Sequence, residues 1–155
     1  MGDALFIVFD LLNLGLVIFL CWFTLKKYQS LPQRIPTHFD VEGKADNFGN
    51  KKYFFLSPIL SVILYIGIFF LVRSPDIANF PVEITDTNRD VQFFIMNFFI
   101  RWLFVLIVFI FLNSQDYTFR YTFDENAKSR VSFSTMLFSM IGSLIAVFII
   151  SAQFK

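Results

Sequence analysis

The sequence predicts an all-α integral membrane protein with four transmembrane helices and a small polar cap formed by loops 1 and 3. The chain has 155 residues, of which 56% are hydrophobic and only 16% are charged. Its mean hydropathy is +0.63, and a soluble domain of this length cannot bury so much apolar surface. Four apolar runs with short connections, without a repeat or low-complexity linker, indicate a single membrane domain over residues 1–155.

Each apolar run has about the 20 residues that a helix needs to cross roughly 30 Å of hydrocarbon. A backbone in lipid must satisfy its own hydrogen bonds, so helices are expected for runs of this length. We expect the first run to be a span rather than a cleaved signal peptide, because no basic residue precedes it and it ends in "CWFTLKK". The four predicted spans cover residues 4–25, 53–72, 93–112 and 131–151.

The second and third spans carry signals at their starts. Proline lacks the donor that an interior helical turn needs, and we expect a kink at Pro58, because a helix start there would leave only about 15 residues for the span. Thr87 and Asp90 form a capping-box pattern, which predicts a start of the third helix near Asn88. From there to Leu112 is roughly 37 Å of helix, so its first turns should protrude from the hydrocarbon.

The fourth span contains a group of small residues in "SMIGS". Ser139 and Ser143 are four positions apart, and Gly142 lies beside them. Small residues let helix backbones approach each other closely in a membrane. We therefore interpret this group as a packing face rather than as a site of chemistry.

Two ionisable residues lie inside predicted spans, Asp10 in the first and Arg101 in the third. A charge inside hydrocarbon costs about 2.5–3.5 kcal/mol, so each needs a partner. The two spans run in the same direction, and the residues lie at similar depth. We expect an intramembrane ion pair, extended by Asn13 and Asn97. Snorkelling of Arg101 to the interface and a proton or ion relay are alternatives, but no polar path crosses the bilayer.

A polar insert follows the first span. "IPTHFDVEGKADNFGNK" holds the only histidine and three of the twelve acidic residues of the chain. Pro32 and Pro36 favour extended backbone before them, and "THFDV" is suited to a short strand. On such a strand His38, Asp40 and Glu42 project to one side.

These three side chains and Asp46 are weak candidates for a metal site, because imidazole and carboxylate groups are metal ligands. Their spacing matches no known metal motif. Hydrogen bonds that stabilise the loop explain the same residues, and we expect neither a metal nor a cofactor.

The segment "YTFRYTF" in loop 3 alternates aromatic residues with Thr and Arg, which predicts a strand. An aromatic strand beside a membrane is either an interfacial anchor or a partner for the strand of loop 1. We expect the two strands to lie close together in the cap, where the aromatic side chains are candidates for a partner surface: Tyr117, Phe119, Tyr121 and Phe123.

The polar loop of residues 31–52 resembles the signature of a bacterial membrane-protein family, the domain of unknown function numbered sixteen-forty-eight, which includes SdpI-like toxin-immunity proteins. "NFPVEITDTNRDVQFF" is similar to the second polar loop of its four-helix members, so the resemblance covers residues 31–102. It implies a multi-pass protein of the bacterial cytoplasmic (inner) membrane. The signature residues are Leu31, Pro32, Ile35, Pro36, Thr37, His38, Phe39, Asp40, Gly43, Asp46, Gly49 and Lys51.

Two orientations in the membrane stay open. Loops 1 and 3 carry nine Lys and Arg residues against three at the other end, which favours a cytoplasmic cap. Relatives in the resembled family often have a basic N-terminus, which places the same loops outside. The nine residues are Lys26, Lys27, Arg34, Lys44, Lys51, Lys52, Arg120, Lys128 and Arg130, and the three are Arg73, Arg89 and Lys155.

The sequence argues against several function classes. It has no nucleophile–base pair and no cofactor motif, which disfavours a membrane enzyme or transporter. A net charge of +1 with scattered basic residues gives no support for nucleic-acid binding. We expect a non-enzymatic immunity or sensing protein, which recognises a toxin-like peptide or a protein through the polar loop. An accessory subunit of a larger bacterial membrane complex is the alternative.

Overall fold

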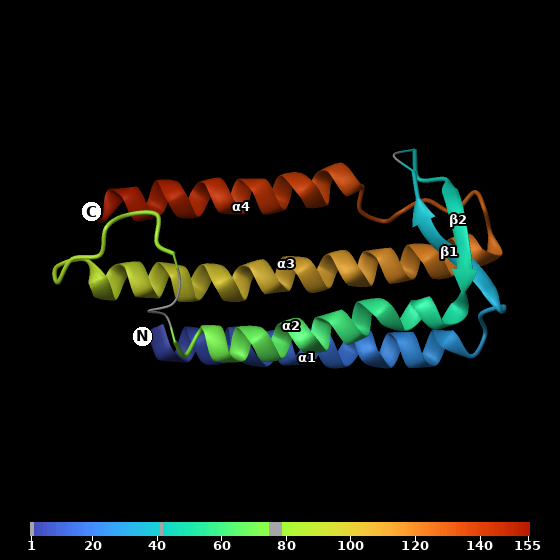
Figure 1. Cartoon of the computed structure of the whole chain (residues 1–155), viewed down its shortest axis with the longest axis horizontal. Helices are drawn as coiled ribbons and strands as arrows, with labels where there is room; N and C mark the ends of the chain where they lie inside the picture. Colours follow the sequence, from blue (N-terminus) through green and yellow to red (C-terminus); the bar gives the residue numbers. More distant parts are fainter. Residues whose placement is uncertain (1, 41, 75–78) are drawn as a thin grey trace.

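The computed structural model describes residues 2–40, 42–74 and 79–155. Four long helices lie side by side, and a two-stranded antiparallel hairpin crosses one end of them beside the α3–α4 loop (Figure 1). Both ends of the chain lie at the opposite end of the bundle. The four long apolar helices confirm the predicted fold class. The elements are α1 (Gly2–Tyr28), β1 (Arg34–Phe39), β2 (Ala45–Asn50), α2 (Leu56–Leu71), α3 (Arg89–Phe123) and α4 (Phe133–Gln153).

The main apolar core lies between α1 and α3. Val17 and Leu20 of α1 pack against Phe104 and Val108 of α3, and all four are buried. Tyr65 of α2 adds its ring, whose centroid is 6.0 Å from that of Phe104. By contrast, α4 packs mainly against α3 and leaves most of its surface exposed.

The predicted kink at Pro58 is wrong. A 3₁₀ helix, η1 (Lys51–Phe55), leads directly into α2, and Pro58 is the third residue of that α-helix. The first N–H groups of a helix have no partner within it, so proline loses no hydrogen bond there. Because η1 and α2 are continuous, residues 51–71 are long enough to cross a membrane.

The third helix begins as predicted, but without the predicted capping box. Its N-cap is Asn88, which makes no side-chain cap hydrogen bond. Instead the Asn88 Oδ1 atom accepts a hydrogen bond of 2.9 Å from the Thr85 N–H, in the turn before the helix. The Thr87 hydroxyl lies 2.9 Å from that of Thr85.

The strand predicted over residues 117–123 is also wrong, because α3 continues to Phe123. Once a helix has formed, each further residue adds one backbone hydrogen bond, which outweighs the strand preference of aromatic residues. The alternating aromatics then divide between two helix faces. Tyr117 contacts Tyr121 edge to face, and Phe119 contacts Phe123 at a tilt, both at a spacing of four residues.

The small residues of α4 do not form the predicted face as a group. A Cβ atom added at Gly142 would meet no atom within 4 Å. Ser143 does face α3, where its Oγ accepts a hydrogen bond of 3.0 Å from the Trp102 Nε1 atom. Close backbone packing at Gly142 is therefore absent from this structure.

Candidate functional site

The cap consists of the hairpin with its flanking residues, 31–52, and the last turns of α3, residues 114–123. The Asn113 side chain bonds the Val131 carbonyl at 3.1 Å, just before α4 begins. The ten residues of α3 that follow therefore project roughly 15 Å beyond the start of α4. This projection places an aromatic helix beside the hairpin.

The base of the cap is a second apolar cluster. Leu31, Ile35 and Phe54 are buried together, so the hairpin is anchored to η1 at its open end. The Gln115 Nε2 atom of α3 donates a hydrogen bond of 2.5 Å to the Phe54 carbonyl. These contacts tie the hairpin, η1 and α3 to one another.

The turn end of the hairpin rests on two tyrosines of α3. The Phe39 ring centroid lies 4.6 Å from that of Tyr117 and 5.2 Å from that of Tyr121. The Tyr117 hydroxyl donates to the Gly43 carbonyl, and the Ala45 N–H donates to the Tyr121 hydroxyl at 3.2 Å. Gly43 has φ +83°, a conformation that glycine adopts without steric cost.

The strand expected over "THFDV" is present in part, because β1 ends at Phe39 and Val41 lies outside the described residues. The strand partner of β1 is β2. In their register Pro36 lies opposite Phe48 and Phe39 opposite Ala45, with an irregularity beside Thr37. The closeness expected between loops 1 and 3 is confirmed by the contacts of Phe39 with α3. The contact is between a strand and a helix rather than within a sheet.

Cysteine crosslinking distinguishes these two arrangements. In a Cys21→Ser background, Phe39→Cys is expected to crosslink with Tyr117→Cys and Tyr121→Cys, because both lie on the α3 face that meets the hairpin. Phe119→Cys should react much less, although a strand would place it on the same side as the two tyrosines. Disulfide yield on a non-reducing gel gives the result. Equal yields at 117, 119 and 121 would contradict the helix.

The polar residues of the hairpin have separate local partners. His38 Nδ1 lies 2.6 Å from Asp46 Oδ1. Asp40 Oδ1 accepts hydrogen bonds from the Glu42 and Lys44 N–H groups at 2.9 and 2.8 Å. Lys44 Nζ lies 3.1 Å from a Glu42 carboxylate oxygen. Glu42 belongs to the turn rather than to β1, so the expected one-sided triad does not form.

Within the described ranges, no three His, Cys, Asp or Glu side chains gather as a metal site. The carboxylate of Asp40 instead holds the turn, as an Asx side chain commonly does. The other candidate ligands are engaged in pairs. These hydrogen bonds therefore explain why the polar residues are there, since they fix the shape of the loop.

One surface of the hairpin remains open. The side chains of His38 and Asp46 are largely exposed, and Phe48, which is 42% exposed, lies on β2. The exposed ring of Tyr53 packs close to Gly49, where an added Cβ would lie 3.1 Å from it. Because Gly49 and Phe48 are successive residues of β2, Tyr53 lies on the opposite face from Phe48. We call His38, Asp46 and Phe48 the exposed hairpin surface.

The four aromatic residues of the α3 end differ in role. Tyr117 and Tyr121 hold the hairpin, while Phe119 packs at the base, 4.4 Å below the Lys27 ammonium. Of the four only Phe123 is classed as exposed, at 59%. As a set they build the cap, and Phe123 alone remains for a partner.

The structure brings Asp10 and Arg101 together inside the helix bundle. The buried guanidinium donates from Nε to Asp10 Oδ1 at 2.8 Å and from Nη2 to Oδ2 at 3.3 Å. Its Nη1 atom donates to the Asn97 backbone and side-chain oxygens, both at 3.1 Å. Asn13 donates to the Arg101 carbonyl at 3.2 Å. The Asp10 side chain is still 42% exposed.

Two polar groups with clear structural roles were not predicted from the sequence. Gln92 is buried in α3 and donates at 2.9 Å to the carbonyls of both Ser151 and Phe154, which holds the end of α4. Gln115 plays the corresponding role at the cap. A single amide within or beside an apolar run is the signal that would have identified both.

A charged cluster closes the α3–α4 connection. Asp116 Oδ2 lies 2.9 Å from Arg120 Nε and 2.8 Å from Arg130 Nε. The hydrogen bond to Asp116 and its negative charge raise the pKa of Arg130 further above its ordinary value. Arg130 is therefore charged at every physiological pH.

The hairpin and the helices that flank it match the model of a known protein family. Residues 15–62 match the family model described as a domain of unknown function, DUF1648. The match runs from the middle of α1 through the hairpin to the first turns of α2, and it contains all the signature residues. The similarity of residues 63–102 to four-helix members stays a prediction. Neither the curated proteins nor the solved structures gave a significant match.

Proposed function

We propose that this multi-pass membrane protein, which carries a DUF1648 domain, is an SdpI-like immunity or sensing protein of the bacterial inner membrane. It has no enzymatic activity and recognises a toxin-like peptide or a protein segment through the exposed hairpin surface. The observation that carries this proposal is the construction of the cap. Most of its signature residues hold the fold, and they present a small set of exposed side chains on a fixed base.

Fixed anchoring is what a recognition surface requires, because groups already ordered cost less entropy on binding. The hairpin is held at both ends, by the Ile35 cluster at its base and by Tyr117 and Tyr121 at its turn. Between them Phe48 offers an exposed aromatic ring, a residue type enriched at protein interfaces. The nearby His38–Asp46 pair adds polar contacts.

A survival assay tests the proposal. A sensitive bacterium that expresses the full chain is challenged with the secreted peptide fraction of the source organism, and survivors are counted. Protection is expected with the native chain and should fall about tenfold with Phe48→Ala, since an interface aromatic often contributes over 1 kcal/mol. Phe154→Ala, at the opposite end of the bundle, is the matched control. Equal protection by both variants would contradict the role of the hairpin.

An accessory subunit of a larger membrane complex is the second candidate. One observation favours it, namely that the Asp10 side chain is 42% exposed although it lies within a candidate membrane span. Charged groups in spans usually face protein or water, so a partner helix that covers Asp10 would remove this exposure from lipid. A stoichiometric protein that co-purifies in mild detergent, together with no toxin protection, would support this candidate over the first.

A further inference from the structure

The positive charge of the cap is concentrated at its base, where the cap meets α1 and α2. Five of the nine basic residues of loops 1 and 3 lie there. The stretches 11–39 and 47–74 contain no Asp or Glu. Among the described residues, none of the five side chains forms an ion pair with a carboxylate. The five are Lys26, Lys27, Arg34, Lys51 and Lys52.

The other basic residues of the cap are balanced by acids. Residues 113–130, which include the α3–α4 connection, hold three acids and three Lys or Arg residues. The hairpin turn, residues 40–46, holds three acids and one lysine, and Lys44 Nζ lies 3.1 Å from the Glu42 carboxylate. An excess of positive charge is therefore confined to the base of the cap.

Aromatic rings rather than carboxylates hold three of these ammonium groups. Their Nζ atoms lie between 4.4 and 4.8 Å from a ring centroid, which is within the range of a cation–π contact. A ring does not neutralise the charge of a lysine, and each ammonium group has three N–H donors. The three charges can therefore still attract an anion. The pairs are Lys26 with Trp22, Lys27 with Phe119 and Lys51 with Tyr28.

The base of the cap lies at the edge of the hydrocarbon. Two of its lysines directly follow the apolar run of α1, and two directly precede that of α2. These two helices lie side by side, so the four lysines are at one level (Figure 1). Trp22 and Tyr53, which are 50% and 62% exposed, are close to them in the chain. Since Trp and Tyr are enriched at membrane interfaces, this location favours a lipid headgroup over an acidic protein segment.

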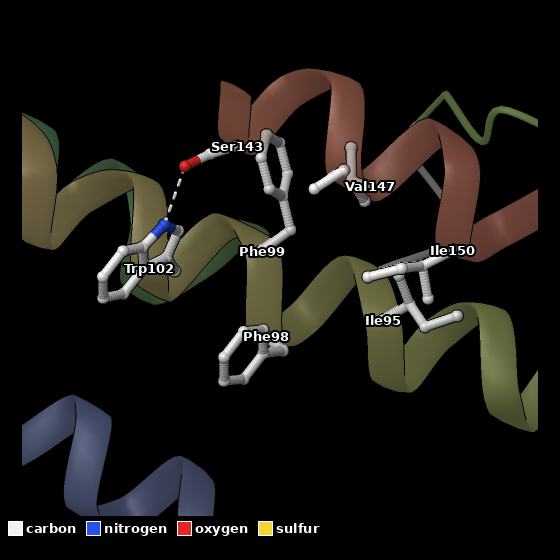
Figure 2. A pocket seen from close by; sticks show the side chains of 8 residues that line it. Ile95, Phe98, Phe99, Trp102, Ser143, Val147 and Ile150 are labelled. Carbon is white, nitrogen blue, oxygen red and sulfur yellow. Dashed lines mark hydrogen bonds between the residues drawn. The ribbon is translucent and has the colours of Figure 1, made fainter. Parts of the chain in front are cut away.

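The seam between α3 and α4 provides an uncharged contrast. It contains a cavity of about 160 Å³ beside Trp102, and no charged side chain is among the described residues that line it. Its polar groups bond each other, since Trp102 Nε1 donates to Ser143 Oγ at 3.0 Å (Figure 2). Lipids at Trp102 are therefore expected to be selected by their acyl chains and not by their headgroups.

We propose that the base of the cap binds the headgroups of anionic phospholipids in the adjacent leaflet. Trp22 and Lys26 are both exposed and lie four residues apart on one face of α1. A lipid on this face places its phosphate at Lys26 and its acyl chains along the helix at Trp22. One basic residue at an anionic membrane surface gives roughly a fivefold preference. This surface is separate from the exposed hairpin surface.

Fluorescence quenching by brominated lipids tests this proposal. The full chain with Trp102→Phe keeps Trp22 as its one tryptophan, and the chain with Trp22→Phe keeps Trp102. Each is placed in vesicles of phosphatidylcholine. The probes are phosphatidylglycerol and phosphatidylcholine, brominated at the depth of the tryptophan that reports. At Trp22 the anionic probe should bind roughly fivefold more tightly than the zwitterionic one. At Trp102 this ratio should be close to one.

Two lysine variants and a competing anion complete the test. Lys26→Gln should lower the ratio at Trp22 at least twofold. Lys128→Gln is the matched control, because it removes an exposed lysine from the balanced α3–α4 connection at the same end of the bundle. It should leave the ratio unchanged. Inorganic phosphate, added at constant ionic strength, should not displace phosphatidylglycerol from Trp22.

Three results would overturn the proposal. Equal ratios at Trp22 and Trp102, or equal effects of Lys26→Gln and Lys128→Gln, would show only a diffuse attraction to the whole leaflet. A ratio of one at Trp22 would favour an acidic protein segment as the partner of these lysines. Displacement by inorganic phosphate would assign the lysines to a dissolved anion instead of a lipid.

Discussion

Arg101→Gln is expected to destabilise the protein by about 3 kcal/mol, because it leaves the Asp10 carboxylate without its partner inside the membrane. The guanidinium makes four hydrogen bonds, two of them to Asp10 and two to Asn97. Glutamine cannot reproduce this bidentate geometry. For a chain of this size the loss corresponds to a decrease of roughly 6–12 °C in the midpoint of thermal unfolding, measured in mild detergent.

The double variant Asp10→Asn/Arg101→Gln separates pairing from packing. Asp10→Asn alone should also destabilise the protein, since it leaves the buried guanidinium charge uncompensated. With both charges removed, at least half of the Arg101→Gln loss should be recovered. Asp3→Asn, an acid in the first turn of the same helix, is the control and should change the midpoint little. Strictly additive losses would show that the two residues are not coupled.

Ile35→Ala is expected to open the hairpin at a cost of about 2–4 kcal/mol, the usual penalty for a cavity at a buried aliphatic residue. Ile35 is only 1% exposed and packs with Leu31 and Phe54 at the base of the cap. The loss is local, because the α1–α3 core does not include this cluster. Hydrogen exchange of the β2 amides should accelerate by more than tenfold, while exchange in α1 and α3 stays slow.

The matched control for this experiment is Ile63→Ala, which removes the same atoms from an exposed position on α2. It should leave hydrogen exchange in β2 unchanged. If Ile35→Ala also left exchange in Ala45–Asn50 unchanged, the hairpin would not depend on its base. The exposed hairpin surface, which we propose recognises a toxin, would then be held in place by its contacts with α3 alone.

Much of the membrane architecture could be predicted from local sequence. Four apolar runs gave four helices because a chain in hydrocarbon has to satisfy its backbone hydrogen bonds within each segment. The depth of Asp10 and Arg101 followed from helix rise and from the shared direction of their spans. The two ends of the bundle followed in the same way, because successive spans alternate in direction.

The cap shows where local sequence was insufficient. The alternation of "YTFRYTF" predicts a strand, yet residues 117–123 extend an existing helix. Tyr117 and Tyr121 lie on one face at either period, two or 3.6, so their contact with Phe39 could be anticipated although the secondary structure was wrong. The kink predicted at Pro58 was wrong for a related reason, because no sequence pattern indicated the 3₁₀ helix that precedes α2.

The amino-acid sequence by itself determined the membrane class, the four helices, which loops share one end of the bundle and the polar signature of the hairpin. These features depend on interactions within a segment or on the contrast between hydrocarbon and water. Only the tertiary structure decided that β1 pairs with β2, that two tyrosines of α3 hold the turn, and that the α3–α4 seam stays unfilled. Each of these depends on which side chains meet across elements far apart in the chain, and packing of that kind is not encoded in the periodicity of any single segment.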